Sequence, residues 1–178
     1  KLADGVPVIV STTAEDNYTL SAAAIEKHLT DKTVAVIINS PSNPTGTMYT
    51  RKQLEDIADL ALDRGFCVIS DEIYDEMVFE GSTFESIATL RPGMEKQTLI
   101  INAVSKTYSM TGWRVGSAVG NKQLIDGLVR VKSNIDSGIS NAVQYMGIEA
   151  LENTTQEWIE ANNDIYWRRR DRVVEVLN

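Results

Sequence analysis

Four short polar segments each adjoin an apolar run, and together they hold the residue types that could perform chemistry. One of them contains Lys106, which follows the apolar run 98–102. A lysine in such a place is unusual, because lysine is rarely buried unless it is paired or reactive. Burial lowers the pKa of a lysine and makes its amine a nucleophile for Schiff-base formation. The competing interpretation is a lysine that extends its amine into solvent.

Two further segments supply an acid, a phenol and an amide. Asp71 follows the apolar run 66–70, where a carboxylate without a cationic or protonated partner would be costly to bury. Tyr74 would lie on the same side as Asp71 if this segment turns helically. Asn43 lies in segment 40–46, whose two prolines restrict the backbone. The simpler interpretations are a helix N-cap at Asp71 and an ordinary connecting loop around Asn43.

The fourth segment, 111–116, places Arg114 between two glycines. Arginine offers a forked donor for a phosphate or a carboxylate, and glycine permits a close approach of the backbone. A surface ion pair is the competing interpretation. Taken together, the four segments match the needs of pyridoxal 5'-phosphate (PLP). This cofactor requires an amine that forms the Schiff base, a carboxylate that keeps its pyridine nitrogen protonated, and neutral donors for its phenolate oxygen.

The order and spacing of these segments resemble those of the class I/II aminotransferases of PLP fold type I. The resemblance covers essentially the whole chain and rests on four motifs, namely Asn43-Pro44-Thr45-Gly46, Asp71 with Tyr74, Ser105-Lys106, and Gly112-Trp113-Arg114-Val115-Gly116. Each motif alone is common, but the combination is specific.

The resemblance implies a role for each residue. Lys106 would be the Schiff-base lysine and the catalytic base. Asp71 would pair with the pyridine nitrogen and Tyr74 with the phenolate oxygen. Asn43 would contact the phenolate oxygen and the substrate carboxylate, and Arg114 would hold the phosphate.

Ser105 is a further expected phosphate ligand. Many members of the family place a hydroxyl three residues before the lysine, and that position is Ala103 in this chain. The hydroxyl of Ser105 would therefore supply the phosphate contact.

The implied activity is the transfer of an amino group between an amino acid and a 2-oxo acid by a cytoplasmic homodimer. Segment 131–138 resembles LL-diaminopimelate aminotransferases, and an aspartate-specific or broad-specificity enzyme is equally compatible with the motifs. Two rival functions stay open. One is that of a different fold type I PLP enzyme, such as a C–S lyase or a decarboxylase, and the second is that of the aminotransferase-like sensor domain of a regulator.

Short β-branched runs alternate with amphipathic stretches, which is typical of βαβ units and a mostly parallel sheet. We predict a three-layer α/β/α fold with strands at 6–10, 33–39, 66–70, 98–102 and 113–119. Helices are predicted behind N-caps at Ser21, Thr50 and Asn121, over 140–151, and from 156 to the end of the sequence. Ligands of such sheets bind at the carboxyl ends of the strands, where the polar segments lie.

Composition narrows the classes of partner. The chain has 178 residues, and 17 Lys+Arg against 25 Asp+Glu give a net charge of −8, which argues against a nucleic-acid-binding surface. The single cysteine, Cys67, excludes an internal disulfide and is compatible with the cytoplasm. The longest apolar run, 34–38, is far shorter than the roughly 20 residues that span a bilayer. We expect neither a membrane nor a metal ion as a partner.

We expect residues 1–152 to form part of a PLP-binding large domain and residues 153–178 to form a long helix that leads toward a small domain. Three family features are missing from the sequence. They are the Gly/Ser-rich helix start that binds the phosphate, the aromatic residue that stacks on the pyridine ring, and the arginine that binds the substrate α-carboxylate. We therefore expect the 178-residue chain to be a fragment with weak activity or none, because loss of positioning removes orders of magnitude in rate.

Overall fold

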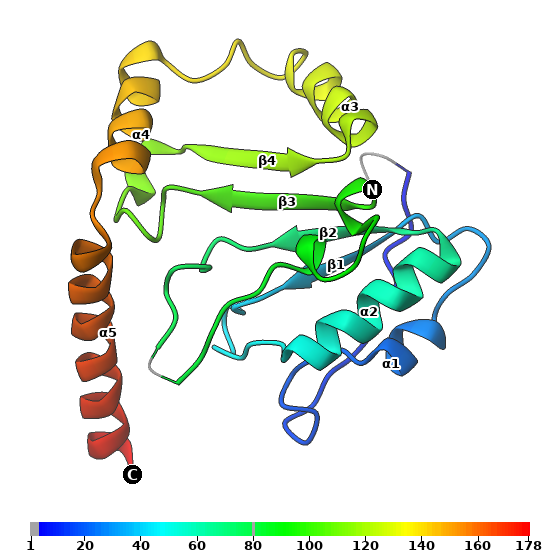
Figure 1. Cartoon of the computed structure of the whole chain (residues 1–178), viewed down its shortest axis with the longest axis horizontal. Helices are drawn as coiled ribbons and strands as arrows, with labels where there is room; N and C mark the ends of the chain where they lie inside the picture. Colours follow the sequence, from blue (N-terminus) through cyan, green and yellow to red (C-terminus); the bar gives the residue numbers. More distant parts are fainter. Residues whose placement is uncertain (1–3, 80) are drawn as a thin grey trace.

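A four-stranded sheet forms the centre of the protein in the computed structural model, which describes residues 4–79 and 81–178 (Figure 1). The sheet has the order β1 (Ala35–Asn39), β2 (Cys67–Asp71), β3 (Thr98–Ala103) and β4 (Gly116–Gly120). β1, β2 and β3 are parallel, and β4 runs antiparallel to β3. The predicted α/β class with a mostly parallel sheet is confirmed.

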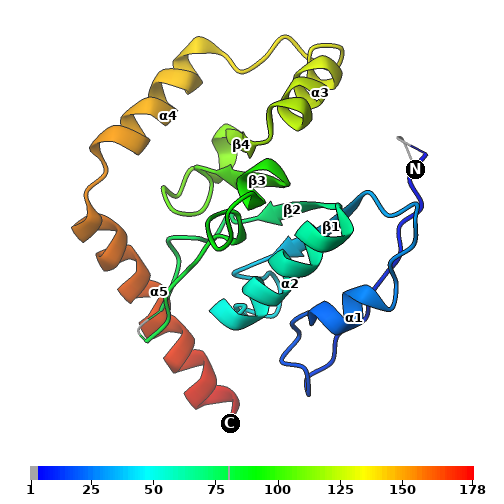
Figure 2. The same cartoon turned by 45° about the vertical axis from the view of Figure 1, so that its right-hand side comes forward.

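The described residues also form five α-helices and three 3₁₀ turns. The α-helices are α1 (Ala22–Glu26), α2 (Arg51–Arg64), α3 (Lys122–Lys132), α4 (Asn141–Asn153) and α5 (Gln156–Leu177). The 3₁₀ turns are η1 (Ile87–Thr89), η2 (Met94–Lys96) and η3 (Thr111–Trp113). α1 and α2 lie together on one side of the sheet, whereas α3, α4 and α5 follow β4 around the other side (Figure 2).

The hydrophobic core lies between the sheet and the α1–α2 layer. Its buried side chains come from α1, α2, β1, β2 and the two 3₁₀ turns that precede β3, and include Ile25, Ile38, Leu54, Ile57, Phe66, Val68, Ile87 and Met94. Val68 and Ser70 are the buried positions of β2. Because side chains alternate along a strand, Cys67, Ile69 and Asp71 face the opposite side of the sheet. That opposite face is more open, since 67% of the surface of Ile37 is exposed.

The helix ends that local signals predict are confirmed. Thr50 accepts a hydrogen bond from the Gln53 N–H, and the Gln53 side chain accepts one from the Thr50 N–H, which completes a capping box. Gly65 ends α2 in the left-handed conformation with φ 73°. Ser21 and Asn121 cap α1 and α3 through their side chains.

Two predicted strands are wrong in whole or in part. Residues 6–10 form no strand, and Val6 and Ile9 are 87% and 79% exposed. A β-branched run becomes a strand only where a neighbouring strand can pair with it. Among the described residues, no strand pairs with residues 6–10. The strand predicted at 113–119 begins only at Gly116, because Arg114 has a left-handed backbone with φ 56°, which a strand does not accommodate.

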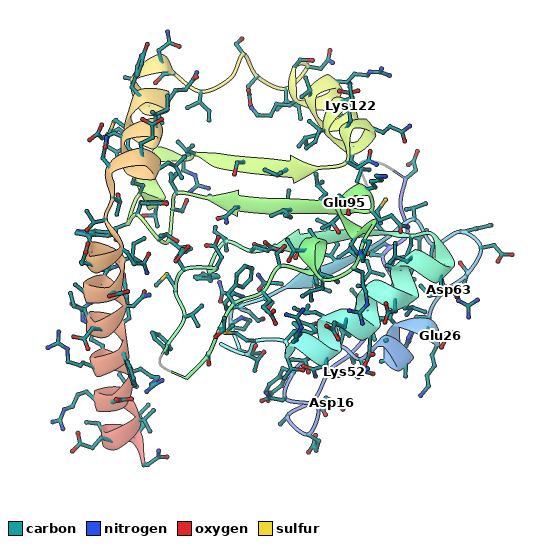
Figure 3. The ribbon with its side chains drawn as sticks, in the orientation of Figure 1. Asp16, Glu26, Lys52, Asp63, Glu95 and Lys122 are labelled. Atoms are coloured by element: carbon teal, nitrogen blue, oxygen red, sulfur yellow. The ribbon has the colours of Figure 1, made fainter. Side chains whose placement is uncertain are left out.

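The carboxyl ends of β1, β2 and β3 point toward the same side of the protein, on the left in Figure 1. Figure 3 shows Glu26 of α1 and Asp63 of α2 on the opposite side of the protein, on the right. α5 contacts the segment that follows β2, since the Asn163 side chain donates a hydrogen bond to the Glu76 carbonyl at 2.6 Å. Within residues 4–79 and 81–178, no helix has both the length and the apolar character that a membrane crossing requires.

Candidate cofactor and active site

The candidate site is built at the carboxyl ends of three parallel strands. Asn39, the last residue of β1, is in register with Asp71, the last residue of β2. Asp71 is in turn in register with Ile101 of β3, two residues before that strand ends. The segments that carry Asn43, Tyr74 and Lys106 therefore leave the sheet at one edge.

Asn39 joins two of these segments through its side-chain amide. Its Nδ2 donates a hydrogen bond to the Asp71 carbonyl at 3.2 Å, and its Oδ1 accepts one from the Asn43 N–H at 2.9 Å. Asn39 is not among the site residues predicted from the sequence. The signal was available, because Asn39 is the first polar residue after the apolar run 34–38.

The loop that carries Asn43 closes on itself. The Gly46 N–H donates to the Ser42 carbonyl at 2.8 Å, and the Ser42 N–H donates to the Thr47 carbonyl at 2.9 Å. Gly46 has φ 71°, a left-handed backbone that glycine adopts without strain. Asn43 is exposed at this turn, so its side chain is free to reach a ligand.

Asp71 begins a tight turn that presents Tyr74. The Asp71 carboxylate accepts a hydrogen bond from the Ile73 N–H at 3.3 Å, as a side chain at the start of a turn commonly does. The Asp75 N–H then donates to the Glu72 carbonyl at 3.0 Å. Residues 73–76 form a turn and not a helix, so Asp71 is not a helix N-cap, and its carboxylate stays partly exposed at the strand end.

Lys106 lies in the turn that follows β3, and its amine faces Tyr74. The Lys106 Nζ is 5.4 Å from the centroid of the Tyr74 ring. Lys106 is half-buried, whereas Val104, Ser105 and Thr107 around it are only 4–6% exposed. Burial of its neighbours anchors the turn, and the Lys106 amine lies beside the Tyr74 ring.

Two acids near this edge, Glu72 and Asp75, were not predicted from the sequence. The Glu72 carboxylate accepts hydrogen bonds from Ser70 Oγ at 2.8 Å and Ser86 Oγ at 2.7 Å. Burial raises the pKa of Glu72, and the two hydroxyls oppose part of the rise. Burial also raises the pKa of Asp75, whose carboxylate accepts a 2.6 Å hydrogen bond from Asn102.

Arg114 and Ser105, the two predicted phosphate ligands, take no part in the contacts described above for Asn39, Tyr74 and Lys106. Arg114 is exposed, and its Nη1 donates to the Thr111 carbonyl at 2.8 Å. Across residues 4–79 and 81–178, no hydrogen bond or ion pair links Arg114 to Lys106 or Asp71. Ser105 is 6% exposed and lies next to Lys106 in the turn after β3.

The donor set fits PLP. An amine, a phenol, a carboxylate and an amide all follow the carboxyl ends of neighbouring parallel strands, and they are the groups that would engage the cofactor's aldehyde, phenolate oxygen and pyridine nitrogen. The phosphate would need a further cationic donor, and the Arg114 guanidinium is of the suitable type. In the described part of the chain, no group of three or more histidine, cysteine or carboxylate side chains is placed to hold a metal ion.

Comparison with known proteins finds aminotransferases among the relatives of this chain. The chain is 44% identical to an aspartate aminotransferase of Bacillus sp. (strain YM-2) over 178 residues, which are 100% of this chain and 45% of that protein. It is 39% identical to an asparagine–oxo-acid transaminase of Streptococcus mutans over 99% of this chain and 45% of that protein. The chain thus spans about half the length of the curated relatives that it matches.

Solved structures agree with these relatives. The aspartate aminotransferase of Rhizobium meliloti superposes with a TM-score of 0.93 at 34% identity, covering 98% of this chain and 44% of that one. An aromatic aminotransferase from Pyrococcus horikoshii superposes with a TM-score of 0.92 at 38% identity, covering 99% and 48%. The family model "Aminotransferase class I and II" matches residues 1–178. Because that match extends over the whole sequence, the chain belongs to the class I and II aminotransferases.

Proposed function

We propose that the protein is a PLP-dependent aminotransferase, and that the 178 residues form much of its cofactor-binding part. The observation that carries the proposal is Lys106 beside the Tyr74 ring at the sheet edge where Asp71 ends β2. Membership of the aminotransferase family supports it. A primary amine in this setting suits a covalent bond to the aldehyde carbon of PLP.

Each residue of the site has a defined task in this proposal. PLP, when bound, supplies an electron-withdrawing ring that stabilises the negative charge left when the substrate loses its α-proton. Lys106 holds the cofactor covalently and then moves the proton at the substrate α-carbon. The Asp71 carboxylate holds the proton on the pyridine nitrogen. The hydroxyl of Tyr74 and the amide of Asn43 donate to the phenolate oxygen, and Asn43 also contacts the substrate carboxylate.

The phosphate is assigned to Arg114 and Ser105. The Arg114 guanidinium is exposed, and one of its nitrogens is held by the Thr111 carbonyl at 2.8 Å, which leaves other donors of the fork for an anion. Ser105 adds a hydroxyl on the turn that carries Lys106. This part of the proposal rests on the family resemblance, since the two residues lie outside the network around Asn39.

We infer aspartate as the amino donor and a 2-oxo acid as the acceptor. Several similar proteins are named aspartate aminotransferases, including those of Bacillus sp. (strain YM-2), Geobacillus stearothermophilus and Bacillus subtilis. These names favour aspartate over LL-diaminopimelate. We further propose a homodimer and a cytoplasmic location, and both rest on the family resemblance.

The 178 residues alone are proposed to be weakly active or inactive. The chain spans 45% of the Bacillus sp. relative, so the rest of such a protein would supply further contacts to the phosphate and the substrate carboxylate. The boundary between residues 1–152 and 153–178 belongs to the same proposal. The 22-residue length of α5 supports the proposal that residues 153–178 form a long helix that leads toward a second domain.

Covalent trapping tests the central assignment. The protein is mixed with PLP, the visible absorption band is recorded, borohydride reduces the adduct, and peptide mass mapping locates it. We expect the adduct on Lys106, its loss in Lys106→Ala, and its retention in Lys96→Ala, which removes a lysine at the opposite end of β3. An adduct elsewhere would contradict the assignment. In the full-length protein, amino transfer that requires a 2-oxo acid then separates an aminotransferase from a lyase or a decarboxylase.

A further inference from the structure

We propose that Asn39 is a positioning residue that fixes Asn43 relative to Asp71, so that the two cofactor contacts act as one unit. The inference rests on the proposed function, because both contacts are assigned to PLP there. Asn39 itself is not expected to touch the cofactor. It acts through the backbones of the two segments that it bridges.

The orientation of the Asn39 amide follows from its partners. The Asn43 N–H can only donate, so it requires the amide oxygen, and the Asp71 carbonyl can only accept, so it requires the amide nitrogen. The observed contacts of 2.9 Å and 3.2 Å satisfy both requirements at once. The flipped amide would satisfy neither group.

Packing does not hold Asn43 in place. Pro44 and Thr45 after it are exposed, whereas Ser40 and Pro41 before it are buried. The loop is therefore anchored at its start by burial, and the Asn39 amide adds an anchor at Asn43. Asn39 is also the register partner of Asp71, so this anchor is tied directly to the strand end that carries the carboxylate.

Loss of this bridge should have a spectroscopic effect. With PLP held by Lys106, a donor such as Asn43 would stabilise the negative charge of the cofactor's phenolate oxygen and so weaken the hold of that oxygen on a proton. If Asn43 is displaced, the oxygen would hold the proton more tightly, and the pH midpoint of the visible band would rise. We expect a rise of about one pH unit in Asn39→Ala, in line with the loss of one hydrogen bond to a charged group.

Asn121 provides a matched control at the opposite end of the sheet. Its amide also bridges two backbone groups, accepting from the Gln123 N–H at 2.7 Å and donating to the Lys96 carbonyl at 2.6 Å. Asn121→Ala removes an equivalent bridge that lies away from the carboxyl ends of β1, β2 and β3. It should lower the unfolding temperature without moving the pH midpoint.

The test compares Asn39→Ala, Asn121→Ala and the unmodified full-length protein loaded with PLP. The inference is overturned if Asn39→Ala lowers stability as Asn121→Ala does and leaves the midpoint unchanged. Absence of the visible band from the unmodified protein would overturn the proposed function and this inference with it. The two failures are therefore distinguishable.

Two additional measurements show whether Asn39 acts through Asn43. In an Asn43→Ala background, Asn39→Ala should cause no further rise of the midpoint, and an additive rise would contradict the inference. Hydrogen exchange without cofactor gives an independent readout. The Asn43 N–H should exchange faster in Asn39→Ala and stay protected in Asn39→Asp, which keeps the acceptor oxygen and disturbs packing less.

Discussion

The Lys106 Nζ lies 5.4 Å from the centroid of the Tyr74 ring, although the two residues belong to turns that follow different strands. Parallel pairing of β2 with β3 brings these turns to one edge of the sheet. A cation over an aromatic face gains about 0.5–2 kcal/mol, depending on how far it is removed from water. This contact with the amine uses the face of the Tyr74 ring and not its hydroxyl.

The two tasks of Tyr74 can be separated by substitution. Tyr74→Phe keeps the ring against Lys106 and removes only the hydroxyl proposed to donate to the phenolate oxygen. We expect the pH midpoint of the visible band to rise by about one unit in this variant. Tyr74→Leu, which also removes the ring, should in addition weaken PLP binding. An unchanged midpoint in Tyr74→Phe would show that the hydroxyl does not reach the phenolate oxygen.

Glu72 should make stability depend on pH. Burial raises its pKa above the ordinary value of 4.5, with the charges of Asp75 and Asp71 adding to the rise. An acid with a raised pKa in the folded protein favours folding at low pH, and this contribution is lost as the pH rises through the folded pKa. The unfolding free energy of the unmodified protein should therefore fall relative to that of Glu72→Gln as the pH rises from about 4.5 to 7.

Denaturant unfolding at several pH values between about 4 and 7 measures this fall. Each unit by which the folded pKa exceeds the unfolded one corresponds to about 1.4 kcal/mol at neutral pH. Glu152→Gln, at an exposed position, controls for the removal of one negative charge. Parallel pH profiles for the unmodified protein and Glu72→Gln would contradict the prediction.

Gly120 ends β4 where no side chain fits. A Cβ at this position would lie 2.1 Å from the Thr98 carbonyl oxygen, and the backbone has φ +155°. Gly120→Ala should therefore destabilise the protein by about 2–4 kcal/mol. Gly127 is the matched control, since a Cβ there meets nothing within 4 Å in the interior of α3. Gly127→Ala should stabilise by about 0.5–1 kcal/mol, and thermal unfolding should rank the two variants in opposite directions.

Thr50 should contribute to stability through its capping box. Its side chain accepts from the Gln53 N–H at 3.3 Å, and its own N–H donates to the Gln53 side chain at 2.8 Å. Thr50→Ala should cost about 1 kcal/mol of unfolding free energy, whereas Thr50→Ser should retain most of it. Equal losses in both variants, measured by denaturant unfolding, would show that the hydroxyl is not the stabilising group.

Features that depend on neighbouring residues were predictable from the sequence. The capping box at Thr50 and the left-handed end at Gly65 involve partners only a few residues away, so the local pattern contains the needed information. The three parallel strands were also predictable, since their apolar runs are recognisable without knowledge of the partners. The order of Asn43, Asp71, Tyr74 and Lys106 along the chain indicated the family, which the comparisons confirmed.

Features that depend on pairing between distant segments were decided only by the tertiary structure. Residues 6–10 have a strand-like composition, yet a strand requires a partner, which no local pattern can supply. The Asn39–Asp71 hydrogen bond spans 32 residues, and the one between Glu72 and Ser86 spans 14. Both exist because strand register and packing bring separate segments to one edge. The sequence alone therefore determined which residues could perform the chemistry, and the register of the sheet decided which of them meet.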